Sequence, residues 1–196
     1  MTLVRILLAL SLLSVAGCLP RPAKLAPVGA HEILPSDQIE VEWPLEWMTF
    51  RPTENDDNAK KEGIVLLLSR DGFSLQTIRL TKQAAGADFK YTQKKLSTGM
   101  LPQEVAELTL DNIRANPEVI DLSVIESAPA TVLGAPGFKL RYTYRGKTGL
   151  TREVGMYGCL DRDMLVILSL DAPRRYYFEK DWPVLDKVKD SLRWQS

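Results

Sequence analysis

The sequence is poor in the side chains on which most hydrolases and metalloenzymes depend. Its 196 residues include one histidine, His31, and two cysteines, Cys18 and Cys159. Serine and cysteine hydrolases normally use a histidine base, and His31 lies in a proline-rich stretch, so neither kind of active site is expected. No Gly-rich phosphate loop and no clustered His/Cys spacing of a zinc site occurs. We therefore expect no catalytic residue, no metal site and no cofactor, and a protein that is not an enzyme.

The sequence also lacks an excess of either charge, because it has 25 basic and 25 acidic residues. A balanced chain has no overall field that attracts nucleic acid, so we expect no nucleic-acid partner. Long apolar runs are missing as well. The stretch from Ile6 to Val15 follows Arg5, is too short to span a bilayer and leads into small residues, which is typical of a secretory signal peptide.

The end of this stretch, Val15–Cys18, resembles the lipobox of bacterial lipoproteins. Ala16 and Gly17 are small enough for a peptidase subsite, and Cys18 supplies the thiol that a diacylglyceryl group alkylates. The class most often has leucine in place of Val15, and an ordinary secretory signal with a chance cysteine is the alternative. The resemblance implies that residues 1–17 are removed and that acyl chains such as palmitate on Cys18 anchor the protein in a membrane.

The residue after the cysteine indicates which membrane. Leu19 stands where lipoproteins retained in the inner membrane have aspartate. The resemblance therefore implies the outer membrane of a two-membrane bacterium, with the protein facing the periplasm.

Residues 18–36 contain four prolines and predict an extended tether that could reach roughly 55 Å from the bilayer. Residues 37–196 are enough for one domain with a substantial core and scarcely enough for two. If Cys18 becomes a thioether, Cys159 has no partner, so no internal disulfide is expected. Cys159 lies between Gly158 and Leu160 with no neighbouring cation, and we interpret it as a buried structural thiol.

The first part of the domain predicts strands and loops. Apolar residues alternate over 39–43, a second short strand covers 47–50, and the continuous apolar run at 64–68 predicts a central strand. Asp71-Gly72 predicts a hairpin turn into a strand over 75–82. Residues 53–62 are charged and predict a solvated loop. Asp56-Asp57-Asn58 there could suggest calcium, but the glycine and glutamate of an EF-hand are missing.

Two helices are predicted. Residues 83–101 indicate an irregular excursion, after which Pro102 opens a helix that ends at Asn116-Pro117. Val105 and Leu110 fall on its apolar face. Near the end of the chain, Asp181 is predicted to cap a closing helix that covers the sheet.

The plainest pattern is the period-two alternation over 138–145, which predicts a strand paired with 150–160. Pairing Tyr142 with Val154 and Leu140 with Met156 places their side chains on one face. It also leaves a three-residue loop with Gly149 in the left-handed conformation. The next turn holds Asp161 and Asp163, which could be paired acids but are typical turn residues. An apolar strand is expected over 164–170, and another strand over 119–126.

The order of elements resembles that of PsbP-like domains. Ala130–Gly134 is similar to the strand that leads into their meander, and Asp190–Arg193 is similar to their closing serine-hydrophobic-arginine signature. The resemblance covers roughly residues 38–194 and implies an α+β fold, an α/β/α sandwich around a central, mainly antiparallel sheet. The family includes photosystem assembly factors and oxygen-evolving-complex subunits, a Ran-binding protein and small envelope lipoproteins. Most members act by binding, so no catalytic residues carry over.

Two functional classes stay open on the sequence. The favoured one is a binding or assembly factor for an envelope protein, and the alternative is an envelope hydrolase whose carboxylates gather only in the fold. The possible partner surface is a cationic strand face, made of Lys139, Arg141, Arg145 and Lys147. A solvated or covered sheet face is the alternative for these residues. Lys90-Tyr91 and Lys94-Lys95 in the excursion form a second candidate surface, or a mobile loop.

Overall fold

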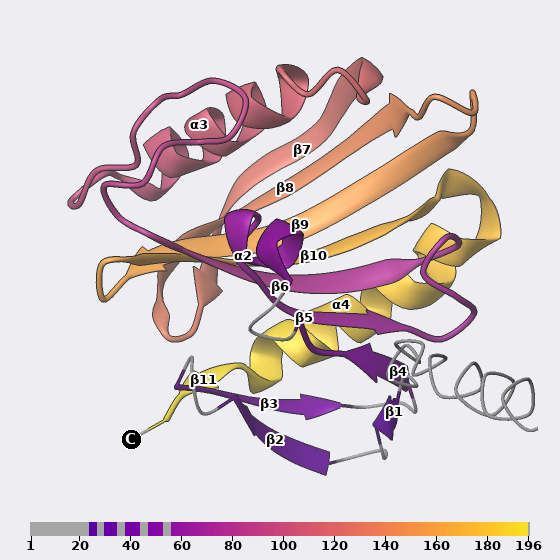
Figure 1. The fold of residues 1–196 in the computed structure, drawn as a ribbon, viewed down its shortest axis with the longest axis horizontal. Coiled ribbons are helices and arrows are strands. Elements are labelled where there is room, and N and C mark those ends of the chain that lie inside the picture. The colour runs from indigo at the N-terminus through magenta and orange to yellow at the C-terminus, as the bar shows by residue number, and fades with distance from the viewer. Residues whose placement is uncertain (1–23, 27–29, 35–37, 44–46, 53–55, 196) are drawn as a thin grey trace, which may run out of the picture.

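The computed structural model describes residues 24–26, 30–34, 38–43, 47–52 and 56–195 (Figure 1). Eight of the described strands form one antiparallel sheet in the order β1-β4-β5-β6-β10-β9-β8-β7. Their bounds are β1 Lys24–Ala26, β4 Trp47–Phe50, β5 Ile64–Ser69, β6 Thr77–Ala84, β7 Ile120–Val132, β8 Ala135–Arg145, β9 Thr151–Asp161 and β10 Met164–Pro173. A small sheet joins β11 (Arg193–Trp194), β3 (Ile39–Trp43) and β2 (Ala30–Leu34).

Helices cover both faces of the large sheet, which confirms the predicted α/β/α sandwich. The helix α3 (Pro102–Arg114) packs on one side, here called the α3 face, and α4 (Glu179–Ser191) packs on the other, the α4 face (Figure 1). A short helix, α2 (Asp57–Lys61), lies beside β5. The kinked turn η1 (Arg174–Phe178) connects β10 to α4.

The meander β8-β9-β10 has the predicted register. Tyr142 pairs with Val154 and Leu140 with Met156, and all four side chains are buried on the α3 face. Gly149 in the connecting loop has φ of 78°, a left-handed value that glycine adopts without a steric cost. The turn after β9 holds Arg162 and Asp163 at positive φ, which matches a tight hairpin. The period-two pattern therefore identified both the strands and their inward faces.

The α4 face is tightly packed. Phe178 and Leu185 are fully buried there with Val188, against the β6 and β10 side chains that point to this side. Trp182 stacks on both Phe178 and Tyr157, with ring centroids 5.5 and 5.6 Å apart. Burial of this many apolar side chains is the main source of stability on this side.

Helix α3 begins at Pro102 as predicted, but the capping prediction for α4 is wrong. Helix α4 already begins at Glu179, so Asp181 lies inside its first turn. The Asp181 carboxylate is fully buried and accepts hydrogen bonds from Arg70 (2.5 Å) and Gln76 (2.8 Å). A long-range ion pair thus takes the place of a local cap.

The predicted tether is wrong for two of its segments, since residues 24–26 pair with β4 and residues 30–34 pair with β3. Their prolines flank these strands without interrupting them. The first paired strand of the described chain begins at Lys24, inside the predicted tether. Other corrections are smaller: residues 57–61 of the predicted loop are helical, and β7 and β10 are longer than expected.

Candidate functional site

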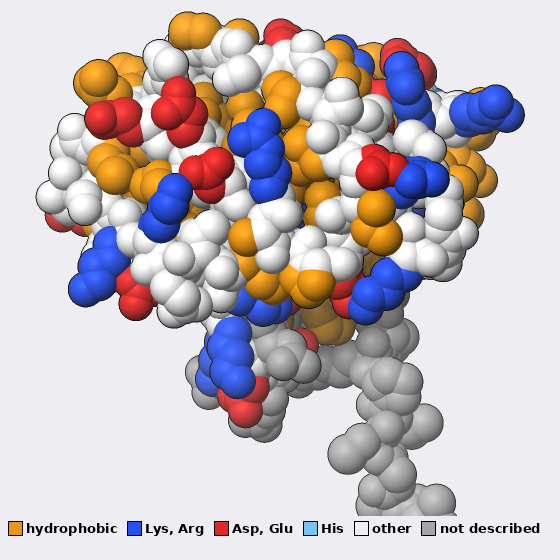
Figure 2. All heavy atoms as spheres, turned by 90° about the horizontal axis from the view of Figure 1, so that it is seen from above, with side chains coloured by type: hydrophobic (Ala, Val, Ile, Leu, Met, Phe, Trp, Pro, Cys, Tyr) orange, Lys and Arg blue, Asp and Glu red, His pale blue; other side chains and the backbone are white. Residues whose placement is uncertain are grey.

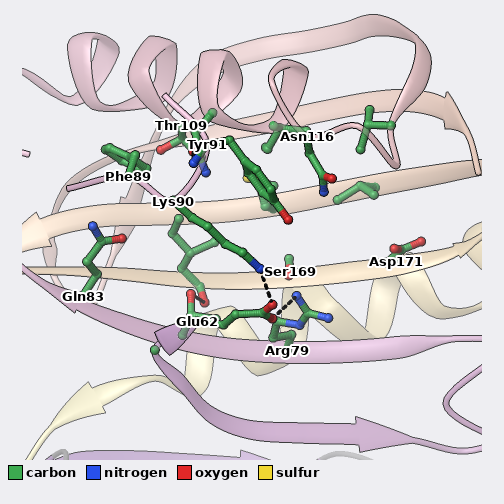
Figure 3. Close-up of a pocket in the computed structure, with 18 of the residues that line it drawn as sticks. Glu62, Arg79, Gln83, Phe89, Lys90, Tyr91, Thr109, Asn116, Ser169 and Asp171 are labelled. Carbon is green, nitrogen blue, oxygen red and sulfur yellow. Dashed lines mark hydrogen bonds and ion pairs between the residues drawn. The ribbon is translucent and has the colours of Figure 1, made fainter. Parts of the chain in front are cut away.

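A cleft of about 1260 Å³ lies on the α3 face, between the sheet and the excursion at residues 85–101 (Figure 3). Side chains of β6, β8, β9 and β10 form its floor, and the end of α3 and the excursion form its roof. The chain from α2 to Gly63 closes the β6 side. Phe89 and Leu96 are buried against α3 and hold the excursion in place, which explains why a segment without periodicity has a defined path.

The floor changes in character from β8 to β6. Tyr142 and Val154 lie toward the α3 side, and on β10 and β6 their row continues with Asp171 and Thr77. The next row runs from Leu140 and Met156 to Ser169 and Arg79. The cleft thus has an apolar half under α3 and a polar half over β6 and β10.

An ion pair bridges the cleft. The Lys90 ammonium from the roof lies 3.0 Å from a carboxylate oxygen of Glu62, whose second oxygen lies 3.9 Å from Arg79 (Figure 3). The hydrogen bond to Glu62 raises the pKa of Lys90 above its ordinary value. One carboxylate is therefore shared by two cations, and a net positive charge stays beside Arg79.

At the other end of the floor, Asp171 is held by two groups. The Arg152 Nε donates to Asp171 Oδ1 at 2.6 Å, and the Tyr144 hydroxyl donates to Asp171 Oδ2 at 2.9 Å. Burial and the Asp171 carboxylate raise the pKa of Tyr144. Arg152 also donates to the backbone oxygens of Ser74 and Leu75, which ties this end of the cleft to the β5–β6 connection.

Three floor residues keep unused hydrogen-bonding capacity. Within the described chain, the Tyr142 hydroxyl, the Ser169 hydroxyl and the Arg79 guanidinium make no hydrogen bond, although Tyr142 is only 5% exposed. Burial raises the pKa of Tyr142, the nearby Asp171 raises it further, and Arg79 lowers it. Tyr142 therefore lies close enough to Asp171 and Arg79 to interact with them electrostatically.

The two acids nearest to these groups are already paired with cations, Glu62 with Lys90 and Asp171 with Arg152. No group of three or more His, Cys, Asp or Glu side chains suited to a metal ion occurs among the residues described. Likewise, no described helix is both long and apolar enough to cross a bilayer.

Of the predicted partner surface, only Lys147 lines the cleft, and all four of its cations are paired. Lys139 contacts Glu126 at 3.0 Å and Arg141 contacts the buried Glu153 at 2.6 Å. Arg145 pairs with Asp121, and Lys147 with Glu118 at 2.7 Å.

Two of these cations are also covered, since Lys139 and Arg141 lie over the Trp182 ring on the α4 face, each 5.2 Å from its centroid. The four therefore do not form a free cationic patch. Figure 2 shows a similar mixture of basic and acidic side chains on the side of α3. A partner role for this surface stays a prediction.

The second candidate surface, in the excursion, becomes part of the cleft. Lys90 and Tyr91 line it, and in Figure 3 the Tyr91 hydroxyl points from the roof toward the side of Ser169 and Arg79. Lys94 instead pairs with Asp111 on α3 at 2.8 Å. Asp161 is the last residue of β9 and accepts a hydrogen bond from the Trp194 indole at 2.7 Å, whereas Asp163 lies in the turn that follows.

The two cysteines differ in what the structure describes. Cys18 lies outside the described residues, so its lipidation stays a prediction. Cys159 is 1% exposed on the α4 face, and burial raises the pKa of its thiol to about 12. Its predicted burial is confirmed.

Sequence reasoning does not single out Arg79, Arg152 or Asp171. The segment 164–170 was expected to be wholly apolar, yet Ser169 interrupts it, and this break together with Asp171 is a signal of a polar floor. Thr77, Arg79 and Thr81 also alternate with buried Ile78 and Leu80 on β6. The alternation on β6 predicts the face on which Arg79 lies. It does not predict that α3 and α2 leave this part of the face uncovered, which makes Arg79 accessible.

Comparisons with known proteins place the architecture. No protein-family model matches the chain, and no curated protein matches it in sequence. Among solved structures, it is similar to cyanobacterial PsbP from Synechocystis sp. PCC 6803, with 12% identity and a TM-score of 0.54 over 93% of this chain and 98% of that one.

Lower scores relate it to the Ran-binding protein Mog1p of Saccharomyces cerevisiae, with 11% identity and a TM-score of 0.49 over 89% of this chain and 97% of that one. LpqN, a Mycobacterium tuberculosis protein involved in cell envelope biogenesis, is 14% identical, with a TM-score of 0.43 over 89% of this chain and 86% of that one. The fold assignment rests on PsbP, whose TM-score exceeds 0.5, and at 12% identity this likeness concerns the fold alone. The chain therefore has a PsbP-like α+β fold.

Proposed function

We propose that the protein is a non-catalytic lipoprotein of the bacterial cell envelope that acts as a binding or assembly factor for an envelope protein or complex. The observation that carries the proposal is the cleft on the α3 face, an open site in which three of the four lining acids, Glu62, Glu118 and Asp171, are paired with lysine or arginine. Paired acids of this kind are poorly placed to act as general acid and base. The alternative, an envelope hydrolase, would need such a pair to be free.

Attachment is the second part of the proposal and is supported by the sequence Val15–Cys18. One acyl chain binds a membrane marginally, whereas two or more anchor stably. Residues 18–23 would then hold the first strand of the domain within about 20 Å of the lipid surface. Since Leu19 follows Cys18, we place the protein in the outer membrane, facing the periplasm.

Acyl labelling in the producing cells tests the attachment. The Cys18→Ala chain should lose the label and appear as a soluble or unprocessed product. Leu19→Asp should keep the label and move the protein to the inner-membrane fraction. Unchanged labelling of Cys18→Ala would refute the lipid anchor.

Partner binding is tested by photo-crosslinking in intact cells. A photoreactive residue at Gln83, in the cleft, should yield one defined adduct with an envelope protein. The same residue at Lys187, exposed on α4, serves as the matched control and should not yield that adduct. Equal adducts from both positions, or none from either, would contradict a partner site in the cleft.

A further inference from the structure

The middle of the cleft floor has the composition of a site for an oxyanion. Arg79 and Ser169 are paired residues of adjacent strands, and both contribute to the cleft. Tyr142 lies in the next row, beside Val154, and Asp171 follows on the far side of Val154. A guanidinium and two hydroxyls thus lie on the same face of the sheet and line one cleft, and none of them has a hydrogen-bond partner in the described chain.

The buried tyrosine makes this arrangement unusual. A hydroxyl on a side chain that is 95% withdrawn from solvent normally has a partner, because leaving it unpaired costs free energy. Tyr142 has none among the described residues, yet it lines the cleft. Its ring is fixed by the core under α3, so the hydroxyl is held in one place for an external acceptor.

The local charge favours an anion. Arg152 neutralises Asp171 at 2.6 Å, and Glu62 is shared between Lys90 at 3.0 Å and Arg79 at 3.9 Å. The Arg79 contact is too long for a hydrogen bond, and the side chain is 46% exposed. An incoming carboxylate or phosphate could therefore accept a bidentate pair of hydrogen bonds from Arg79 without displacing an existing one.

The other half of the floor is apolar. Val154 and Met156 on β9 and Ile167 on β10 line the cleft next to the three polar groups. Ligand sites typically combine such an apolar lining with a few convergent polar groups. The polar part would orient a ligand, and the apolar part would remove its non-polar portion from water.

We propose that the cleft binds an amphiphilic organic anion, a molecule with a carboxylate or phosphate group and an apolar chain. Arg79, Tyr142 and Ser169 hold the oxyanion, and the apolar chain lies against Val154 and Met156. The inference adds a ligand to the proposed function, and either can hold without the other, because a protein partner is detected by crosslinking and the ligand by direct titration.

The test uses the full chain in phosphatidylcholine nanodiscs with ¹³C-labelled methionine methyl groups. The probes are octanoate, octyl phosphate and uncharged octanol, and the readout is the Met156 methyl signal, which reports on the cleft itself. At least one anion should shift this signal saturably and bind at least about tenfold more tightly than octanol. Whichever anion binds more tightly identifies a free carboxylate or a phosphate headgroup as the source.

Variants separate the oxyanion site from unspecific partitioning. Arg79→Gln should weaken anion binding about tenfold or more and leave octanol unchanged. Tyr142→Phe keeps the ring and should weaken anion binding several-fold. Arg145→Gln removes a positive charge outside the cleft and should bind like the unaltered chain. The signals of the other methionines check that each variant is folded.

Two results would overturn the proposal. One is equal binding of the anions and octanol, or no shift of Met156 with any probe. The other is unaltered anion binding by both folded variants, Arg79→Gln and Tyr142→Phe.

Discussion

The two faces of the large sheet differ in how completely side chains and helices cover them. On the α4 face, Trp182 lies so close to β9 that a Cβ on Gly155 would come within 2.0 Å of its ring, and the surrounding apolar side chains are buried. On the α3 face, the helix covers β8 and β9 but leaves the polar residues of β6 and β10 in an open cleft. The large sheet is therefore closely packed over the α4 face and only partly covered on the α3 face.

This difference separates stability from binding. A closed face gains from apolar burial, whereas an open cleft with unpaired donors forgoes that gain. Natural proteins tolerate such a local loss of stability mostly at sites where a bound ligand or partner compensates for it. Changes on the α4 face should therefore affect unfolding, and polar changes in the cleft should affect binding.

The largest effect is expected from Phe178→Ala, which removes a fully buried ring stacked on Trp182. It should lower the free energy of unfolding by about 3–5 kcal/mol, measured by denaturant titration. Tyr176→Ala is the matched control, because this neighbouring aromatic is 68% exposed and should change stability by less than about 0.5 kcal/mol. Similar losses from both would show that the α4 face is not the closed one.

Tyr142→Ala should cost somewhat less, about 3 kcal/mol, since the ring is buried but borders the cleft. Tyr142→Phe should leave stability unchanged or raise it slightly, because the hydroxyl has no partner within the described chain and leaving it unpaired costs free energy. Thr143→Ala, on the opposite side of the strand, should cost under about 1 kcal/mol. Equal losses from Tyr142→Ala and Thr143→Ala in the same titration would contradict the register of β8.

Cys159 gives a pH-dependent comparison. Its thiol has a folded pKa of about 12 against an ordinary value of 9.0, so above pH 9 the unfolded chain loses a proton that the folded chain keeps. Stability should then fall as pH rises through this window, by about 1.4 kcal/mol at pH 10. The difference in unfolding free energy between the unaltered chain and Cys159→Ser isolates this contribution from other groups. A difference independent of pH between 8 and 10.5 would rule it out.

Reactivity checks the same thiol in a second way. Native Cys159 should react slowly with a thiol reagent near neutral pH and become fully reactive in denaturant. Rapid native labelling would contradict its place under α4.

The sequence predicts the meander well because both of its signals are local. The alternation over 138–145 sets the inward faces, and the glycine at 149 sets the loop, so the pairing of Tyr142 with Val154 follows. The start of α3 at Pro102 is local in the same sense. Such features depend on residues within one or two turns of each other.

Long-range features could not be predicted in this way. Asp181 satisfies the rule for a helix cap, but Arg70, 111 residues away, holds it within the first turn. The segments 24–26 and 30–34 have no alternation that distinguishes a strand from a tether, and β4 and β3 supply their hydrogen-bonding partners. The cleft likewise depends on where the excursion packs, which Phe89 and Leu96 decide by burial against α3.

The smallest expected effect concerns the ion pair that bridges the cleft. The Lys90 side chain is 50% exposed and that of Glu62 is 38% exposed. Lys90→Gln should therefore change the unfolding free energy by less than about 1 kcal/mol. The change should shrink in 1 M salt, where the screening length of about 3 Å is comparable with the separation of the two charges. Lys94→Gln is the matched control, because its partner Asp111 lies on α3, on the same side of the cleft. Both variants should be equally stable, but only Lys90→Gln should speed amide hydrogen exchange at residues 87–93, since only that contact ties the roof to the far wall. Equal exchange in the two variants would mean that the packing of Phe89 and Leu96, and not the ion pair, positions the roof.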